Sequence, residues 1–299
     1  MFDSLIKIVR PHHWVKNVIV FIPIFFSTHL LEFTVLFETF MVFISFCLVA
    51  SSIYCLNDVI DREYDSTHPT KSLRPVASGL ISVRHALVLS FSLLMFSLII
   101  GYFISFFTII VLFSYFVNNV LYSLFLKNYA LIDVMMISFG FILRMLAGTT
   151  TIDDPLSEWI ILTTFFLSLF LGFSKRFAEL SSSLNSQSSN EIHKGKVIRK
   201  SLAFYSIESL DSMMVSLMSI TIICYSLYTV SDTAYLKFGN NYLTFTIPFV
   251  VYCMFFYYNT VRVKNDVEDP MVELLSSKNI LISGLLWIIA CLIIILKLI

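Results

Sequence analysis

The most informative shortage in this chain is its shortage of charge. Of the 299 residues only 13% are Asp, Glu, Lys or Arg, whereas 58% are hydrophobic and the mean hydropathy is +0.85. A soluble domain carries about 25% charged residues, so this composition excludes a soluble protein and predicts a polytopic membrane protein. The formal net charge is zero, which leaves no basic footprint for nucleic acid.

Cysteine and histidine are also scarce. The five cysteines lie in or beside apolar runs and form no Cys-x-x-Cys pair, so we interpret them as small buried hydrophobic residues. His12 and His13 lack a partner at metal-ligand spacing, and no His or Cys stands out as a catalytic group. The first apolar run has no small-residue cleavage site, so we interpret it as a retained signal anchor.

Long apolar runs are abundant instead. A membrane-spanning helix needs about 20 predominantly apolar residues, and the runs predict an all-α fold with nine transmembrane helices around a cytoplasm-facing polar cavity. We expect one domain over residues 1–299, with a tight hairpin near residue 104. The predicted spans are 17–31, 36–56, 86–103, 105–123, 131–150, 158–174, 212–230, 243–258 and 280–297.

The basic residues predict the orientation. All of the 20 Lys and Arg residues except Arg144, Lys237 and Lys297 fall on one side of the predicted membrane. The positive-inside rule makes that side cytoplasmic, which predicts a cytoplasmic N-terminus, an external C-terminus and a site facing the cytoplasm of the cell (inner) membrane. The longest cytoplasmic segment, 175–211, has a polar middle at 181–190 that we expect to be mobile, followed by an amphipathic helix at 199–211.

A cluster of carboxylates follows the second predicted span. Asp58, Asp61 and Asp65 are spaced i, i+3, i+7, which places them on one face of a helix. Like charges on one face repel unless a divalent cation lies between them, and carboxylate oxygens suit Mg²⁺. Asn57 adds an amide oxygen or a hydrogen bond to phosphate. The cluster predicts a Mg²⁺ site for a multiply phosphorylated substrate; the alternative is a solvated loop with scattered charges.

Basic residues next to this cluster are candidate phosphate ligands. Lys71 and Arg74 follow the carboxylates directly, and Arg presents a fork that matches phosphate oxygens. The alternative is a basic cluster attracted to anionic lipid headgroups. Lys16, at the start of the first apolar run, either reaches into a cavity or anchors the chain at the interface by snorkelling.

Polar residues in and beside later spans form three further candidates. Tyr122 and Lys127 lie near the end of span four, where the alternatives are an aromatic belt residue and a topological charge. Arg144 lies inside span five, where a buried arginine must have a partner, either a structural carboxylate or a lipid phosphate; we slightly favour the structural role. After span six, Lys175 and Glu179 share a helix face next to Arg176, which suits phosphates or describes an ordinary basic helix end.

Together these motifs resemble the UbiA-type intramembrane prenyltransferase superfamily. Within it they are most similar to decaprenyl-phosphate phosphoribosyltransferases, over residues 10 to about 210. The stretches that carry the resemblance are Arg10-Pro11-x-x-Trp14-x-Lys16-Asn17, Asn57-Asp58-x-x-Asp61-x-x-x-Asp65, His68-Pro69-Thr70-Lys71-x-x-Arg74-Pro75, Gly140-Phe141-x-Leu143-Arg144-x-x-Ala147-Gly148 and Lys175-Arg176-x-x-Glu179-Leu180.

The resemblance implies a Mg²⁺-dependent enzyme that moves 5-phosphoribosyl from phosphoribosyl diphosphate to a polyprenyl phosphate of the decaprenyl type. Pyrophosphate is released, and the product serves arabinose-precursor synthesis for a cell wall or glycan. Asp58 and Asp61 would be catalytic and would bind the metal together with Asp65. The implied substrate-binding residues are Lys16, Asn57, Lys71, Arg74, Tyr122, Lys127, Arg144, Lys175, Arg176 and Glu179.

One departure bears on the substrate. Typical UbiA prenyltransferases have a second Asp-rich motif after span six, where this chain has Lys175-Arg176-Phe177-Ala178-Glu179. A single carboxylate cluster suits one diphosphate and one 5-phosphate better than a prenyl diphosphate held between two Asp motifs. The alternatives are prenyl transfer to a small acceptor and a lipid or small-molecule transporter. The expected partners are phosphoribosyl diphosphate, polyprenyl phosphate and the membrane, and a homo-oligomer stays open.

Overall fold

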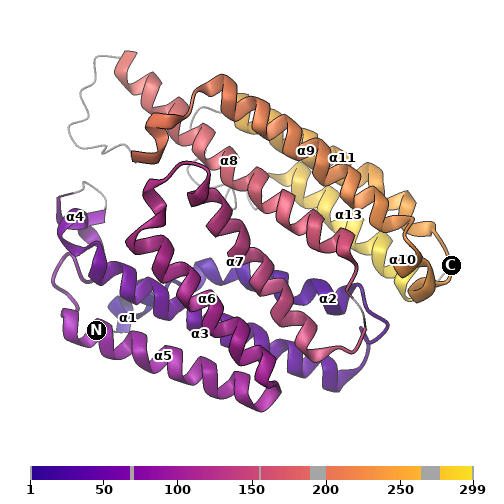
Figure 1. The fold of residues 1–299 in the computed structure, drawn as a ribbon, viewed down its shortest axis with the longest axis horizontal. Coiled ribbons are helices and arrows are strands. Elements are labelled where there is room, and N and C mark those ends of the chain that lie inside the picture. Colours follow the sequence, from indigo (N-terminus) through magenta and orange to yellow (C-terminus); the bar gives the residue numbers. More distant parts are fainter. Residues whose placement is uncertain (1, 68–70, 155, 189–199, 264–276, 298–299) are drawn as a thin grey trace. The chain divides into compact units, whose positions relative to one another are not determined.

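Helices are the only regular secondary structure in the part of the chain that the structure, a computed structural model, describes: residues 2–67, 71–154, 156–188, 200–263 and 277–297 (Figure 1). The prediction of an all-α fold is confirmed. Within these residues, eight helices are long and apolar enough to cross a membrane. Such segments satisfy their own backbone hydrogen bonds, as the bilayer interior requires.

The described residues fall into two compact units, and the single-domain interpretation stays a prediction. Unit 1 holds those of Met1–Lys127 and Gly140–Asp154, and unit 2 those of Asn128–Phe139, Pro155–Ile192 and Ile198–Ile299. The helices up to the first unit boundary, with η marking 3₁₀ helices, are α1 (Phe2–Val9), η1 (Pro11–Phe21), α2 (Ile22–Phe25), α3 (Phe33–Ile60), α4 (Arg62–Ser66), η2 (Lys71–Leu73), α5 (Val83–Ile104), α6 (Phe106–Leu124) and η3 (Leu126–Asn128).

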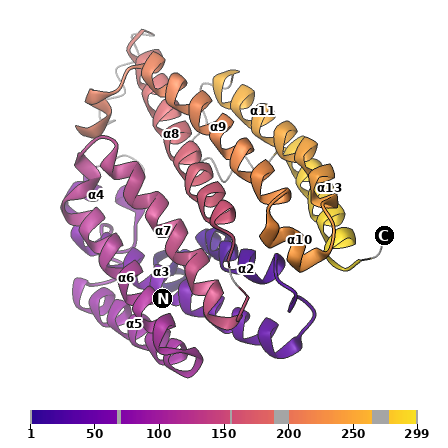
Figure 2. The ribbon, with the colours of Figure 1, turned by 45° about the vertical axis from the view of Figure 1, so that its right-hand side comes forward.

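Helix α7 (Ile132–Gly148) begins in unit 2 and continues into unit 1, where η4 (Thr149–Thr151) follows it. Figure 2 gives a second view of the helices. The remaining helices all belong to unit 2: α8 (Glu158–Ser188), η5 (Lys200–Phe204), α9 (Ile207–Thr229), α10 (Asp232–Phe238), η6 (Tyr242–Thr246), α11 (Ile247–Val263) and α13 (Lys278–Ile295).

In unit 1, α3 is the central helix and packs along α5, α6 and η1. Small polar residues bring α3 and α5 together: the Ser90 hydroxyl donates to the Ser52 carbonyl at 2.8 Å, and the Ser97 hydroxyl donates to the Ser45 carbonyl at 2.8 Å. All four serines are buried. Small side chains allow close approach of membrane helices, and interhelical hydrogen bonds hold them there. This packing makes α3 a firm support for the residues at its C-terminal end.

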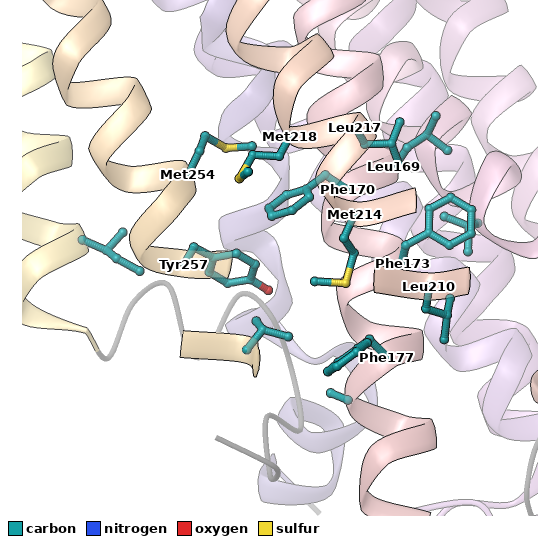
Figure 3. Close-up of a cluster of buried hydrophobic side chains, with 14 residues drawn as sticks. Leu169, Phe170, Phe173, Phe177, Leu210, Met214, Leu217, Met218, Met254 and Tyr257 are labelled. Carbon is teal, nitrogen blue, oxygen red and sulfur yellow. The ribbon is translucent and has the colours of Figure 1, made fainter. Parts of the chain in front are cut away.

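In unit 2, α8 and α9 pack along each other, and α11 contributes to the same hydrophobic core (Figure 3). The Phe170 and Tyr257 rings meet edge to face at 5.6 Å between centroids, an arrangement that aromatic pairs favour. Met214 and Met254 line the same cluster. Gly172 permits close contact between α8 and α7, because a Cβ built there would lie 2.5 Å from Val134 Cγ1.

The hairpin expected near residue 104 is confirmed. Helix α5 ends at Ile104 and α6 begins at Phe106, with Ser105 between them in an extended conformation. The Ser105 hydroxyl accepts a hydrogen bond from the Thr108 backbone N–H at 3.1 Å. Ser105 is thus the N-cap of α6, a position that serine favours because its side chain satisfies an otherwise unpaired N–H.

The first predicted span, 17–31, does not form one long helix. Its residues belong instead to the eleven-residue η1, the four-residue α2 and the turn after it. Pro23 lies in the first turn of α2, where a missing N–H is tolerated. A 3₁₀ helix rises about 2.0 Å per residue, so η1 is about 22 Å long. The four residues of α2 add about 6 Å.

The segment after span six contains more helix at its start than we expected, and the helix predicted at 199–211 is wrong. Helix α8 continues to Ser188 through most of the segment 181–190 that we expected to be mobile; residues 189–199 lie outside the described residues. The Ser183 hydroxyl donates to the Leu180 carbonyl at 2.7 Å, so this polar residue is satisfied within the helix. The amphipathic helix expected at 199–211 is replaced by η5 and the start of α9, where Ser206 and Ser209 form a capping box.

Candidate active site

Two carboxylates are buried where α3 ends. Helix α3 continues past the apolar run to Ile60, Asp61 interrupts it, and the short α4 carries Asp65 back beside Asp58. Asp58 and Asp65 are each only 1% exposed. Ionised carboxylates are rarely so deeply buried unless they are paired or bind a cation. Their surroundings therefore indicate what this site does.

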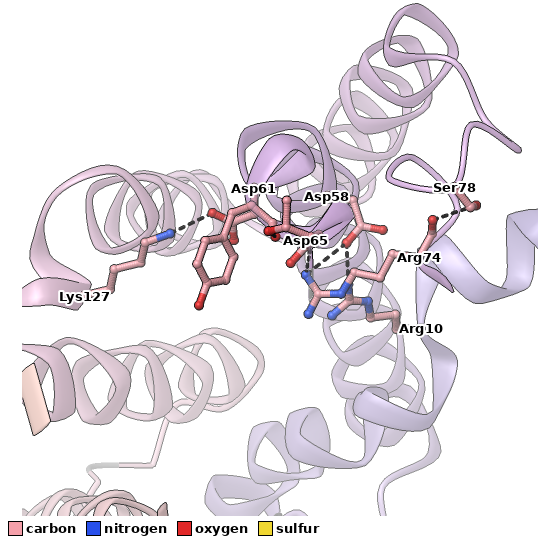
Figure 4. A network of polar contacts seen from close by, with 9 residues as sticks. Arg10, Asp58, Asp61, Asp65, Arg74, Ser78 and Lys127 are labelled. Carbon is pink, nitrogen blue, oxygen red and sulfur yellow. Dashed lines mark hydrogen bonds and ion pairs between the residues drawn. The ribbon is translucent and has the colours of Figure 1, made fainter. Parts of the chain in front are cut away.

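Two arginines surround these carboxylates (Figure 4). Arg10 Nη2 donates a hydrogen bond to Asp58 Oδ1, and Arg74 Nη1 donates to Asp65 Oδ2 at 2.6 Å. Arg74 Nη1 also lies 3.8 Å from Asp58 Oδ1. Arg74 therefore lies in the carboxylate cluster that precedes it in the sequence.

Asp61 has a different partner. Lys127 Nζ donates to Asp61 Oδ1 at 2.8 Å, and both side chains are about one-third exposed. Asp61 has φ −90° and ψ 6°, so the helix does not continue regularly through it and the three carboxylates do not share one regular face. Among the described residues, no three Asp, Glu, His or Cys side chains are grouped closely enough to hold a metal ion. The carboxylates are instead paired with basic side chains: Asp58 and Asp65 with Arg10 and Arg74, and Asp61 with Lys127.

Three oxygen atoms in this region have no hydrogen-bond donor among the residues that the structure describes. They are Asn57 Oδ1, Asp58 Oδ2 and Asp65 Oδ1, and all three atoms are buried. Leaving a buried acceptor unsatisfied costs about 1–3 kcal/mol, so such atoms need an explanation. Carboxylate and amide oxygens are ligands that hard cations such as Mg²⁺ accept. The donor set at the end of α3 therefore fits a divalent cation.

Arg10 is a site residue that the sequence interpretation included in a motif but did not assign. Its backbone has φ 54° and ψ 59°, the left-handed region, between α1 and Pro11. Non-glycine residues rarely adopt this conformation, and such strain is concentrated at functional sites. The Arg10 guanidinium also lies 5.2 Å from the Tyr54 ring centroid. The Arg10-Pro11 pair was the only local signal for this role.

The other predicted binding residues of unit 1 are distributed along several elements. Lys71 is half-buried in η2, with Nζ 5.5 Å from the Tyr64 ring centroid. Lys16 is half-buried in η1, and Tyr122 is half-buried in α6. The motif residues 68–70 lie outside the described residues.

Arg144 is buried in a second polar cluster of unit 1. Its Nε donates to Asn17 Oδ1 at 2.7 Å, and its Nη2 donates to the Tyr115 hydroxyl at 2.6 Å. Its Nη1 donates to the Gly140 carbonyl at 2.9 Å, and the Tyr115 and Phe141 rings stack near the guanidinium. The structural carboxylate that we expected is not among the ion pairs of the described residues. Neutral acceptors and aromatic rings take its place.

In unit 2, Arg176 is buried in an ion-pair network. Its Nε donates to Asp133 Oδ2 at 2.9 Å and its Nη1 to Glu179 Oε2 at 2.7 Å. The side chains of Arg176 and Asp133 are 2% and 0% exposed, whereas Glu179 is 26% exposed and Lys175 is half-buried. The Ser201 hydroxyl also donates to Asp133 Oδ2, at 3.4 Å. The guanidinium predicted to bind phosphate is thus already bound to two carboxylates.

This network shows what the sequence interpretation missed in unit 2. Asp133 lies in the first turn of α7, and its Oδ1 accepts a hydrogen bond from the Val134 N–H at 2.9 Å. Its second oxygen joins α7 to α8 and η5. Nearby, the Leu131 N–H donates to the Tyr205 hydroxyl at 2.6 Å, and burial raises the pKa of Tyr205. Asp133 and Arg176 are 43 residues apart in the sequence, so no local sequence pattern predicts their pairing.

Comparison with known proteins shows the family to which this chain belongs. Residues 18–277 match the UbiA prenyltransferase family. A decaprenyl-phosphate phosphoribosyltransferase from Mycolicibacterium smegmatis is 35% identical over 235 residues, 77% of this chain and 71% of that protein. One of the same name from Mycobacterium tuberculosis is 31% identical over 252 residues, 83% of this chain and 80% of that protein.

A solved structure shares the fold. It is a UbiA homolog from Archaeoglobus fulgidus bound to DMAPP and Mg²⁺, with 18% identity, a TM-score of 0.71 and coverage of 98% of this chain and 99% of that one. At this identity the likeness shows the fold alone. The family match covers most of the chain and both relatives exceed 30% identity. This chain is therefore an integral membrane protein that belongs to the UbiA prenyltransferase family.

Proposed function

We propose that this protein transfers 5-phosphoribosyl from phosphoribosyl diphosphate to a polyprenyl phosphate of the decaprenyl type and releases pyrophosphate. The two relatives at 31% and 35% identity, both named decaprenyl-phosphate phosphoribosyltransferase, support this substrate pair. The observation on this chain that carries the proposal is the buried pair Asp58 and Asp65, with donor-free oxygens beside two arginines. That arrangement would supply both ligands for a cation and groups that bind phosphate.

Mg²⁺ is the cation that we assign to this site. Asp58 and Asp65 would hold it through their donor-free oxygens, with Asn57 beside them and Asp61 once Lys127 releases it. A bound Mg²⁺ would neutralise charge on the diphosphate that leaves. Asp58 and Asp61 are the residues to which we assign the catalytic role.

Basic side chains of the protein would stabilise the diphosphate leaving group. An oxygen of the lipid phosphate forms a bond to C1 of the ribose, and the bond from C1 to the diphosphate oxygen breaks with its electron pair. Arg10, Arg74, Lys71 and Lys127 would bind the phosphates and stabilise the charge that develops. No general base is needed, because the attacking phosphate is already an anion. The main task of the protein is therefore positioning and charge stabilisation.

The other residues predicted to bind substrate remain part of the proposal on different grounds. Lys16, Tyr122, Lys175 and Glu179 stay proposals from the sequence motifs. For Arg176 we infer that it orients Glu179, since its guanidinium is committed to that carboxylate and to Asp133. The distribution of Lys and Arg supports a cytoplasmic site, a cytoplasmic N-terminus and residence in the cell (inner) membrane.

The test is a reconstituted assay. The protein in lipid nanodiscs is incubated with Mg²⁺, phosphoribosyl diphosphate and decaprenyl phosphate, and we expect pyrophosphate and phosphoribosyl lipid in equal amounts. EDTA should abolish turnover, and so should Asp58→Asn. Glu63→Gln is the matched control, because Glu63 lies in α4 beside the cluster but is exposed.

Two results would overturn the proposal. One is turnover of a prenyl diphosphate with a small acceptor, without turnover of phosphoribosyl diphosphate, which would make the protein a prenyltransferase. The other is full activity of a folded Asp58→Asn or Asp61→Asn variant, which would remove the carboxylate cluster from the mechanism.

A further inference from the structure

The charges at the end of α3 balance without a metal ion. Asp58 and Asp65 contribute two negative charges, and Arg10 and Arg74 contribute two positive charges, so the sum is zero. The carboxylates are almost fully buried, and the arginine side chains are only 17% and 25% exposed. Burying an uncompensated charge is costly. A divalent cation entering alone would leave this cluster two charges positive.

The cluster nevertheless keeps oxygens free for a cation. Asp58 Oδ2 and Asp65 Oδ1 are buried and have no donor within the described part of the chain, although the other oxygen of each carboxylate is bound to an arginine. The arginines thus bind one oxygen of each carboxylate and leave the second oxygen without an arginine partner. Metal alone would make the cluster too positive, whereas a diphosphate alone would make it too negative. Arriving together, the two ligands largely cancel each other's charge.

The two arginines are built to change partners. The Arg10 and Arg74 side chains are both more exposed than the carboxylates with which they pair. A guanidinium offers five N–H donors and binds carboxylate and phosphate by the same fork geometry. Arg10 is additionally fixed by its left-handed backbone and by the Tyr54 ring.

We propose that Arg10 and Arg74 are exchangeable counter-ions, which hold Asp58 and Asp65 in the empty site and bind the diphosphate when it arrives with the metal. The metal and the diphosphate then bind with positive coupling, because each removes the electrostatic penalty of the other. Arg10 becomes a substrate-binding residue of this site. The inference rests on the proposed function for its metal and its diphosphate.

The sign of one measurement distinguishes this role from an ordinary structural one. Binding of Mn²⁺, used as a probe for the Mg²⁺ site, is followed by electron paramagnetic resonance on the full chain in nanodiscs without any phosphate ligand. Arg10→Gln should raise the affinity for bare Mn²⁺ about tenfold, because it removes a positive charge beside the metal ligands. Arg10→Lys keeps the charge and should stay near wild type.

The diphosphate side is measured with radiolabelled pyrophosphate by equilibrium dialysis. In the wild type, saturating Mg²⁺ should tighten pyrophosphate binding at least about tenfold. In Arg10→Gln, this gain should shrink. Arg84→Gln is the control, since Arg84 is an exposed arginine at the start of α5 in the same unit; both measurements should match wild type. Arg74→Gln gives the same test if Arg10→Gln fails to fold.

Two outcomes would contradict the inference in different ways. An unchanged or weaker Mn²⁺ affinity in both Arg10→Gln and Arg74→Gln would overturn the counter-ion exchange and leave the proposed function standing. A wild-type protein that binds neither Mn²⁺ nor Mg²⁺-pyrophosphate would overturn the proposed metal site, and the exchange with it.

Discussion

Arg176 donates a hydrogen bond from Nε to Asp133 Oδ2 at 2.9 Å, and both side chains are almost closed to solvent. The pair joins α8 to the first turn of α7 within unit 2, and Ser201 adds η5 to it. A guanidinium held in this way is bound by protein carboxylates on two sides. We therefore expect the Arg176–Asp133 pair to stabilise the fold rather than to bind substrate.

Breaking this pair should destabilise the protein. Arg176→Gln or Asp133→Asn leaves a buried charge without its partner, which costs about 3–5 kcal/mol. We expect a marked fall in the thermal unfolding midpoint in nanodiscs. Lys175→Gln, the neighbouring half-buried base, should change the free energy of unfolding by no more than about 0.5 kcal/mol. An Arg176→Gln protein of normal stability with a strongly raised KM for phosphoribosyl diphosphate would assign Arg176 to the substrate instead.

The Lys127–Asp61 pair should behave in the opposite way. Both side chains are about one-third exposed, and solvent-exposed ion pairs contribute about 0–1 kcal/mol to stability. Lys127→Gln should leave the unfolding midpoint nearly unchanged while it lowers kcat/KM about tenfold or more through loss of phosphate binding. Arg62→Gln, an exposed neighbour of Asp61, is the control and should have wild-type activity. Wild-type kcat/KM in Lys127→Gln would remove Lys127 from the site.

Arg144 and Asn17 should be energetically coupled. Arg144→Met leaves Asn17 Oδ1 and the Tyr115 hydroxyl without their donor, and each unsatisfied buried group costs about 1–3 kcal/mol. Asn17→Leu removes the acceptor from the same bond. The double variant should be less destabilised than the sum of the single variants, by about 0.5–3 kcal/mol, in chemical unfolding of the solubilised protein. Additive effects would show that the bond contributes nothing to stability.

Gly148 should tolerate no larger residue. A Cβ at this position would lie 2.0 Å from the Val20 carbonyl oxygen, where α7 crosses η1. Gly148→Ala must separate these two backbones, and such overpacking costs about 1–3 kcal/mol or more. Gly284→Ala is the matched control: Gly284 lies in α13 with nothing within 4 Å of its added Cβ, so alanine should stabilise that helix by about 0.5–1 kcal/mol. Equal unfolding midpoints for the two variants would contradict the close crossing.

The site could be predicted from the sequence where its signal is local. Asp58, Asp61, Asp65, Arg74 and Lys127 stand out because charge is rare in an apolar chain and these charges follow predicted spans. In the structure they form direct pairs with one another or with Arg10. Hydropathy likewise predicted nine spans, and eight of them correspond to long apolar helices among the described residues. These features depend on composition and on neighbours in sequence, which a single sequence contains in full.

The identity of the residues that form ion pairs is a different kind of property, and it depends on how the helices pack in the folded protein. Arg10 reaches Asp58 across 48 residues, and Arg176 reaches Asp133 across 43. The sequence motif around Arg176 predicted a phosphate ligand, yet in the folded protein its guanidinium is buried in an ion pair with Asp133. A helical membrane protein with a carboxylate cluster could be predicted from the sequence alone, because the lengths of apolar runs and the spacing of charged residues are local properties. The pairing of buried charges follows from helix packing, because packing decides which side chains are neighbours. A buried charge without an oppositely charged neighbour would be strongly destabilising.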